Sequence, residues 1–234
     1  MSLATDGLAA VLWDMDGTLI DSEQVWTIAL TGLAHHLGGE LSRPAREAMV
    51  GTNMPVSIRL LLDDLGLPAA PRAQADALRW LAARTAQLFA GPLPWRPGAA
   101  EALATVRAAG LPCAMVTNTE RAITALAMRS LGPDNFEAVV CGDDVPMPKP
   151  APDVYLRAAA LLGLPPERCV AVEDSPTGVA AAEAAGCPVL VVPCVVAVPD
   201  GRNRVFRESL VGLTIAELES LVAPKSALIS TDGG

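Results

Sequence analysis

Short apolar runs alternate with stretches of helical periodicity from Pro97 onward, and this alternation constrains the fold more than any other feature. The expected elements are strands at 112–117, 136–141, 169–173 and 189–192, and helices at 98–109, 119–131, 153–162 and 176–185. Thr119 and the pair Ser175-Pro176 are suited to begin two of these helices. With a further apolar run at 8–13 as the first strand, the pattern predicts a doubly wound, Rossmann-like α/β fold with a parallel sheet.

The segment from 21 to 94 differs from the rest, because it shows helical periodicity without a convincing strand. Its apolar stripes at helical spacing are Trp26, Leu30, Leu33 and Leu37; Ile58, Leu61, Leu62 and Leu65; and Leu78, Leu81, Leu88 and Phe89. Glycine and proline pairs divide the stripes, and 91–94 looks like a linker. We therefore expect an all-helical cap domain at 21–94, inserted into an α/β core formed by 1–20 and 95–234. Residues 224–234 are expected to be a frayed tail.

Composition excludes several classes of function. A net charge of −9 and a pI near 4.7 argue against a nucleic-acid partner and against a polybasic membrane anchor. The five cysteines are an odd number without a CxxC pair, which indicates buried thiols in a reducing compartment. No apolar run approaches the ~18 residues of a membrane span. A cytoplasmic protein, with a monomer as the default state, is expected.

Polar side chains stand at or just beyond the ends of the expected strands. They are Asp14 and Asp16, Thr117 and Asn118, Lys149, and Glu173 and Asp174. Because parallel strands place their carboxyl ends on one edge of the sheet, residues scattered over the chain are expected to meet there. Adjacent acids such as Glu173 and Asp174 at the end of an apolar strand are costly to bury unless they are paired or bind a metal.

These residue types suit phosphoryl transfer. A carboxylate, Asp14, can attack phosphorus and divide a difficult hydrolysis into two steps. Magnesium held by Asp14, Asp174 and a backbone carbonyl would neutralise the anions, while Lys149 and the Thr117 hydroxyl would hold phosphate oxygens. Asp16 can exchange protons with the leaving group and with water. The carboxylates considered for the metal site are Asp14, Asp16, Glu173 and Asp174, with Asp174 favoured over Glu173.

Residues 14–19, with the sequence DMDGTL, resemble the first motif of the haloacid dehalogenase superfamily. Thr117, Lys149-Pro150 and Glu173-Asp174 are similar, in order and spacing, to its second, third and fourth motifs. The resemblance implies magnesium, an aspartyl-phosphate at Asp14 and acid/base work by Asp16. The helical insert and residues 172–179 resemble the subfamily that includes β-phosphoglucomutase and phosphoglycolate phosphatase.

Two positions separate a phosphatase from a mutase within this resemblance. Trp26 stands where β-phosphoglucomutases carry a histidine, and Met54 stands three residues after Gly51, where their cap places an arginine. A mutase must hold a second phosphate, and the loss of an arginine weakens that hold. The sequence therefore favours a phosphatase acting on a small phosphorylated metabolite, such as a sugar phosphate or a phosphoglycolate-like acid.

Substrate contacts in the cap are expected from Arg43, Arg46, Thr52 and Asn53, and Asn118 is expected to join Thr117 and Lys149 at the phosphate. Three alternatives remain open at this point. A phosphomutase would need a bisphosphate activator. A signalling receiver also uses Asp, Thr, Lys and magnesium, but its acid pair precedes the phosphorylated aspartate. A non-catalytic phospho-ligand binding protein would not need all four groups of motifs.

Overall fold

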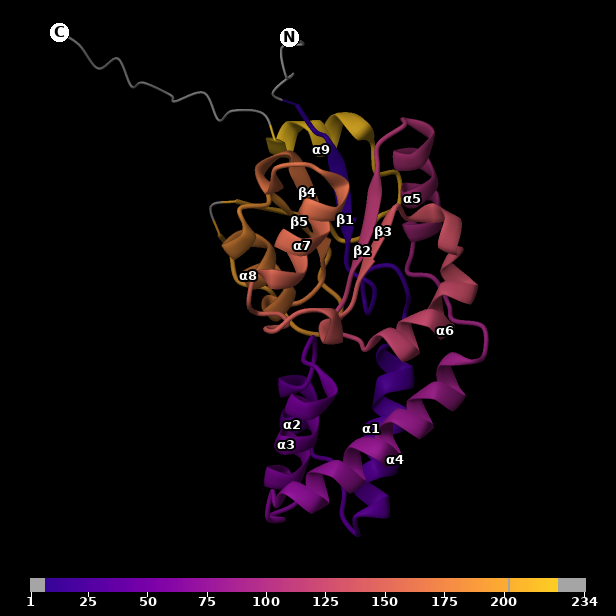
Figure 1. Ribbon diagram of the computed structural model, residues 1–234, viewed down its shortest axis with the longest axis vertical. Coiled ribbons are helices and arrows are strands. Elements are labelled where there is room, and N and C mark those ends of the chain that lie inside the picture. Colours follow the sequence, from indigo (N-terminus) through magenta and orange to yellow (C-terminus); the bar gives the residue numbers. More distant parts are fainter. Residues whose placement is uncertain (1–6, 202, 223–234) are drawn as a thin grey trace, which may run out of the picture.

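A parallel sheet of six strands, in the order β3-β2-β1-β4-β5-β6, forms the centre of the molecule (Figure 1). The computed structural model describes residues 7–201 and 203–222. The strands are β1 (Ala10–Trp13), β2 (Cys113–Val116), β3 (Ala138–Val140), β4 (Cys169–Glu173), β5 (Val189–Val191) and β6 (Arg204–Phe206). The first strand pairs with both β2 and β4, so the direction of winding reverses beside β1. This reversal is the place where open α/β sheets bind ligands.

Helices cover both faces of the sheet, as the alternation of side chains along β1 requires. Val11 and Trp13 belong to an apolar cluster with α5 (Ala99–Ala108), α6 (Arg121–Leu131) and α9 (Ile215–Val222). Ala10 and Leu12 belong to a second cluster with α7 (Asp153–Leu162) and α8 (Pro176–Ala185). Short 3-10 turns lie at Pro133–Asn135, Gly142–Asp144 and Pro166–Arg168. Because β1 is buried on both faces, the position of Asp14, which directly follows this strand, is fixed by the core.

Four helices lie beyond the carboxyl ends of the strands and form the cap (Figure 1). They are α1 (Glu23–His36), α2 (Arg43–Ala48), α3 (Met54–Asp64) and α4 (Pro71–Phe89). The chain enters and leaves the cap side by side, since Asp21 N donates to Pro94 O at 2.8 Å and Arg96 N donates to Leu19 O at 2.9 Å. The apolar faces of α1, α3 and α4 join the same buried cluster as Trp13. The cap is therefore packed against the sheet edge where β1 ends.

The α/β class and the parallel sheet expected from the sequence are confirmed, and so is the cap of Ser175, whose Oγ accepts from Gly178 N at 3.1 Å. The assignment of Thr119 as a helix cap is wrong, because α6 begins at Arg121 after Glu120. Four of the five cysteines are buried as free thiols. Among the described residues, no helix combines the length and apolarity needed to cross a membrane. The expected tail at 224–234 lies outside the described residues.

Candidate active site

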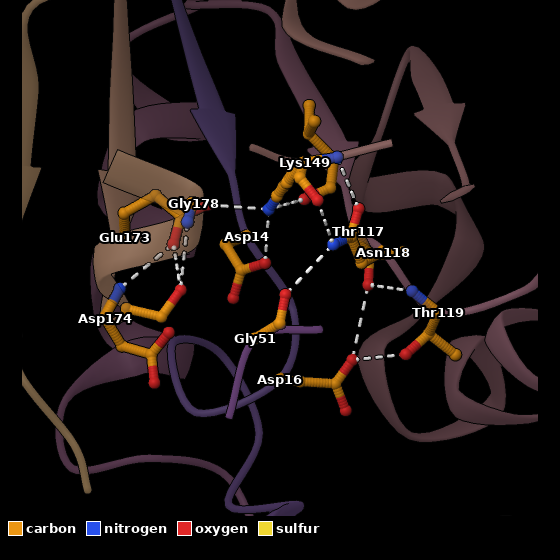
Figure 2. A network of polar contacts seen from close by, with 12 residues as sticks. Asp14, Asp16, Gly51, Thr117, Asn118, Thr119, Lys149, Glu173, Asp174 and Gly178 are labelled. Atoms are coloured by element: carbon orange, nitrogen blue, oxygen red, sulfur yellow. Dashed lines mark hydrogen bonds and ion pairs between the residues drawn. The ribbon is translucent and has the colours of Figure 1, made fainter. Parts of the chain in front are cut away.

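A buried ammonium group joins two of the predicted site carboxylates. Lys149 Nζ donates to Asp14 Oδ1 at 2.7 Å, to Glu173 Oε1 at 2.6 Å and to the carbonyl of Val116 at 2.8 Å (Figure 2). All three hydrogens of the ammonium therefore have an acceptor. Burial alone would lower the pKa of Lys149, but the two carboxylates outweigh it and hold this pKa above its ordinary value. The lysine thus stays charged between Asp14, which directly follows β1, and Glu173 of β4.

Glu173, the last residue of β4, is completely buried and is held on every side. Besides Lys149, the hydroxyl of Tyr155 donates to Oε1 at 2.6 Å, and Asp174 N donates to Oε2 at 3.2 Å. Gly178 lies against the same carboxylate, because a Cβ there would stand 2.0 Å from its oxygens. The Glu173 carboxylate is therefore occupied by protein groups, and it holds the Lys149 ammonium in position. Tyr155 was not predicted, since a single tyrosine on an apolar helix face reads as core.

Two carboxylate oxygens at the same edge lack partners. Asp14 Oδ2 and Asp174 Oδ2 are buried, and neither has a hydrogen-bond partner among the described residues. Burial, followed by the charge of Glu173, raises the pKa of Asp14 to about 8, and burial also raises the pKa of Asp174. Oxygen atoms of Asp14, Glu173 and Asp174 lie within 4.8 Å of one another. Burial thus disfavours the charged form of these carboxyl groups, and a hard divalent cation such as Mg²⁺ would compensate that charge.

The turn after Asp14 brings the backbone close to Asp174. Gly17 has a φ of +86°, and a Cβ at this position would lie 2.2 Å from Asp174 Oδ2. Only glycine accepts that conformation without strain, and only glycine leaves room for the carboxylate. The glycine of the first motif therefore makes space for a candidate metal ligand.

Gly17→Ala is expected to reduce turnover of a phosphate ester by about a hundredfold or more, because the methyl group must displace the Asp174 carboxylate. Gly38→Ala is a matched control, since Gly38 also has a positive φ, of +88°, but its Cβ would meet nothing within 4 Å. Both variants place alanine at a positive φ and so share the backbone strain. The difference in activity between them therefore measures the effect of the methyl group on Asp174. Equal activity of the two would contradict the prediction.

Asp16 points away from the metal-site carboxylates and accepts four hydrogen bonds. Oδ1 accepts from Ser22 Oγ at 2.6 Å and from the indole Nε1 of Trp26 at 2.8 Å. Oδ2 accepts from Thr119 Oγ1 at 2.7 Å and from Thr117 Oγ1 at 3.3 Å. The prediction considered four carboxylates as metal ligands. Three of them, Asp14, Glu173 and Asp174, form a cluster, and Asp16 lies outside it. Thr119 thus binds a charged acceptor, which is a stronger partner than the helix N–H groups it was expected to cap.

The side chain of Asn118 connects the core to the cap (Figure 2). Its Nδ2 donates to the carbonyl of Gly51 at 2.9 Å and to the carbonyl of Lys149 at 3.1 Å. Its Oδ1 accepts from Lys149 N at 2.8 Å. The amide expected at the phosphate is therefore engaged with backbone groups, and it holds the loop that carries Lys149.

A pocket between cap and sheet edge contains Asp14, Asp16, Lys149 and Asp174 in its wall. Three of the four cap residues predicted as substrate contacts also line it: Arg46, Thr52 and Asn53. Arg43 does not, because its side chain is 90% exposed and pairs with Glu47. The pocket adds Glu23 from the first turn of α1, which sequence reasoning missed. An acid at the start of a helix is ordinarily explained by the helix dipole, so no signal distinguished it.

Comparisons with known proteins identify the family. The family model of haloacid dehalogenase-like hydrolases matches residues 8–186. The chain belongs to this family. Protein CbbY of Rhodobacter capsulatus is 37% identical over 198 residues, which are 80% of this chain and 86% of that protein. Hexitol phosphatase B of Escherichia coli K12 is 32% identical over 207 residues, which are 84% of this chain and 86% of that protein. The family and its named phosphatases make this chain a phosphoric monoester hydrolase.

Solved structures share the fold over most of the chain. A crystal structure of CbbY from Rhodobacter sphaeroides with xylulose-(1,5)bisphosphate matches with a TM-score of 0.81 and 30% identity, over 91% of this chain and 99% of that one. A β-phosphoglucomutase of Clostridium difficile matches with a TM-score of 0.80 at 18% identity, over 92% and 97% of the two chains, and shows the shared fold alone.

Proposed function

We propose that this hydrolase is a magnesium-dependent phosphatase that acts on a small phosphorylated metabolite, of the sugar or short-acid type, through an aspartyl-phosphate at Asp14. Two observations at Asp14 carry the proposal. Lys149 donates a hydrogen bond to one of its carboxylate oxygens, and its other oxygen and one oxygen of Asp174 are buried without a hydrogen-bond partner among the described residues. The two free carboxylate oxygens can bind a metal cation and a phosphorus electrophile. A phosphate ester with a divalent metal supplies both.

The first step forms a bond between the Asp14 carboxylate and phosphorus while the ester P–O bond breaks. The leaving alkoxide takes a proton from the protonated form of Asp16, which lies two residues along the same loop and becomes a carboxylate. Lys149 holds the Asp14 carboxylate in place and adds positive charge beside the transferring group. In the second step Asp16 accepts a proton from water, the water oxygen attacks phosphorus, and the bond to Asp14 breaks to release inorganic phosphate.

Asp14 and Asp174 would hold the magnesium ion, with Glu173 beside them. Bound there, the ion would neutralise the crowded carboxylates and the incoming phosphate. The donor set fits this ion, because the free atoms are carboxylate oxygens in a buried position.

Addition of millimolar Mg²⁺ is expected to raise the melting temperature of the free protein by several degrees, because a cation bound only by the folded state stabilises it. The shift is measured by thermal unfolding with and without chelator. Asp174→Asn should lose most of the shift, whereas the exposed Asp63→Asn on α3 should keep it. An equal shift in both variants would place the ion elsewhere.

Phosphate release from a panel of phosphate esters, with Mg²⁺ and with chelator, tests the proposed reaction. We expect release from sugar phosphates or small acid phosphates that depends on the metal. Absence of release from every ester would contradict a phosphatase. Isomerisation of a hexose 1-phosphate without phosphate release would instead establish a mutase.

The cap favours the phosphatase over that alternative. Trp26 Nε1 donates to Asp16, so the position of the mutase histidine is occupied by an indole already engaged with the acid/base residue. Met54, at the first position of α3, is buried and apolar in the pocket wall and offers nothing to a phosphate.

A further inference from the structure

The cap side of the pocket contains an ion pair that the proposed reaction does not use. Arg46 of α2 pairs through Nη2 with Glu23 Oε2 of α1, and the two side chains are 14% and 12% exposed. The same Nη2 donates to the backbone carbonyl of Glu23 at 3.3 Å, and Nε donates to Thr27 Oγ1 at 3.0 Å. The guanidinium is thus fixed by α1 before any substrate enters. Both charged residues line the pocket that contains Asp14.

Each residue of the pair has one polar atom that forms no hydrogen bond with the described residues. Glu23 Oε1 accepts no hydrogen bond there, and Arg46 Nη1 donates none. A hydroxyl group can donate to the carboxylate and accept from the guanidinium at once. A phosphate dianion can only accept, so it would gain from Arg46 and be repelled by Glu23.

Among the described residues, the charges of the pocket leave no cation for a second phosphate. The charged residues of its wall are Asp14, Asp16, Glu23, Arg46, Lys149 and Asp174. Lys149 is already shared by two carboxylates, and Arg46 is neutralised by Glu23. The scissile phosphate has the metal and Lys149 to balance it, whereas a phosphate at the other end would enter a region without net positive charge. The relatives include examples of both substrate types. The CbbY structure contains a bisphosphate, and another relative is named as a phosphatase of hexitols.

We propose that the Glu23–Arg46 pair is a specificity element that accepts the hydroxyl groups of an uncharged polyol chain and excludes substrates with a second phosphate. The inference rests on the proposed function, because it concerns the leaving group of the same substrate. Arg46, held by Glu23, then donates a hydrogen bond to a substrate hydroxyl group and does not bind a phosphate.

The test compares kcat/KM for glucitol 6-phosphate and glucitol 1,6-bisphosphate at saturating Mg²⁺. The wild-type protein should prefer the monophosphate by about tenfold or more, the scale of one unfavourable charge contact. Glu23→Gln should reduce this preference at least about fivefold, mainly through a lower KM for the bisphosphate. Glu47→Gln is the matched control, because Glu47 is half exposed, pairs with an exposed arginine and does not line the pocket.

A second variant moves the ratio in the opposite direction, which separates charge selection from damage to the fold. Arg46→Gln leaves Glu23 unpaired, so the preference for the monophosphate should increase. Arg72→Gln, on the exposed surface of α4, is its control. A wild-type preference for the bisphosphate, or ratios that neither pocket variant changes, would overturn the inference while phosphatase activity stands. Absence of phosphate release from every ester would overturn the proposed function and this inference with it.

Discussion

Asp14→Asn is expected to lower hydrolysis of an aryl phosphate in Mg²⁺ by about 10⁴-fold or more, the scale seen when a nucleophile is removed. The amide has the size of the carboxylate but cannot form the bond to phosphorus. Lys149 keeps Glu173 and the Val116 carbonyl as acceptors, so the local structure should persist. The measurement is phosphate release under single-turnover and steady-state conditions.

The control for this loss is the stability of the variant. Asp14 is one of three crowded, buried carboxylates, so its neutral replacement should leave the melting temperature equal or higher. Asp63→Asn, on the exposed side of α3, should retain full turnover. Turnover of Asp14→Asn near the wild-type rate, in a folded protein, would show that another group attacks phosphorus.

Lys149→Met is expected to lower the free energy of unfolding by about 3–5 kcal/mol and to abolish turnover. The variant leaves Asp14 and Glu173 buried without their cation, and these are the groups that bind the ammonium at 2.7 and 2.6 Å. Denaturant unfolding of the metal-free protein measures the loss, and the aryl phosphate assay measures turnover.

A second substitution shows whether uncompensated charge causes that loss. Glu173→Gln in the Lys149→Met background removes one of the two stranded carboxylates, so it should restore part of the stability without restoring activity. A loss below about 1 kcal/mol in the single variant would contradict the role given to the ion pair. So would a double variant that is less stable than Lys149→Met.

Much of the sheet was predictable because its strands are continuous apolar runs that are buried on both faces. The expected run at 169–173 coincides with β4, and the others differ from the observed strands by a few residues at their ends. Strand β6 (Arg204–Phe206) was missed, because its three residues are at most partly buried at the edge of the sheet and show no apolar run. Helix α9 was missed because it is short and buries a single residue, Leu218.

The site was predictable where topology alone brings residues together. Asp14, Thr117 and Asp174 line one pocket because parallel strands end at one edge, and the loop after β3 adds Lys149. The roles of other side chains depend on partners that are distant in sequence, which spacing does not reveal. Thr119 binds Asp16 across 103 positions, and the exposed Arg43 was indistinguishable from Arg46 before the helices of the cap were placed.

The most direct test of the central claim is to trap the covalent intermediate. The protein is mixed with Mg²⁺ and a ³²P-labelled phosphate ester that it hydrolyses, quenched with acid within the first turnover, digested and analysed by mass spectrometry. The proposal predicts label on the peptide that contains Asp14, removable by hydroxylamine as an acyl phosphate is, and absent from Asp14→Asn. Rapid hydrolysis without label on that peptide, or label on another residue, would contradict the account.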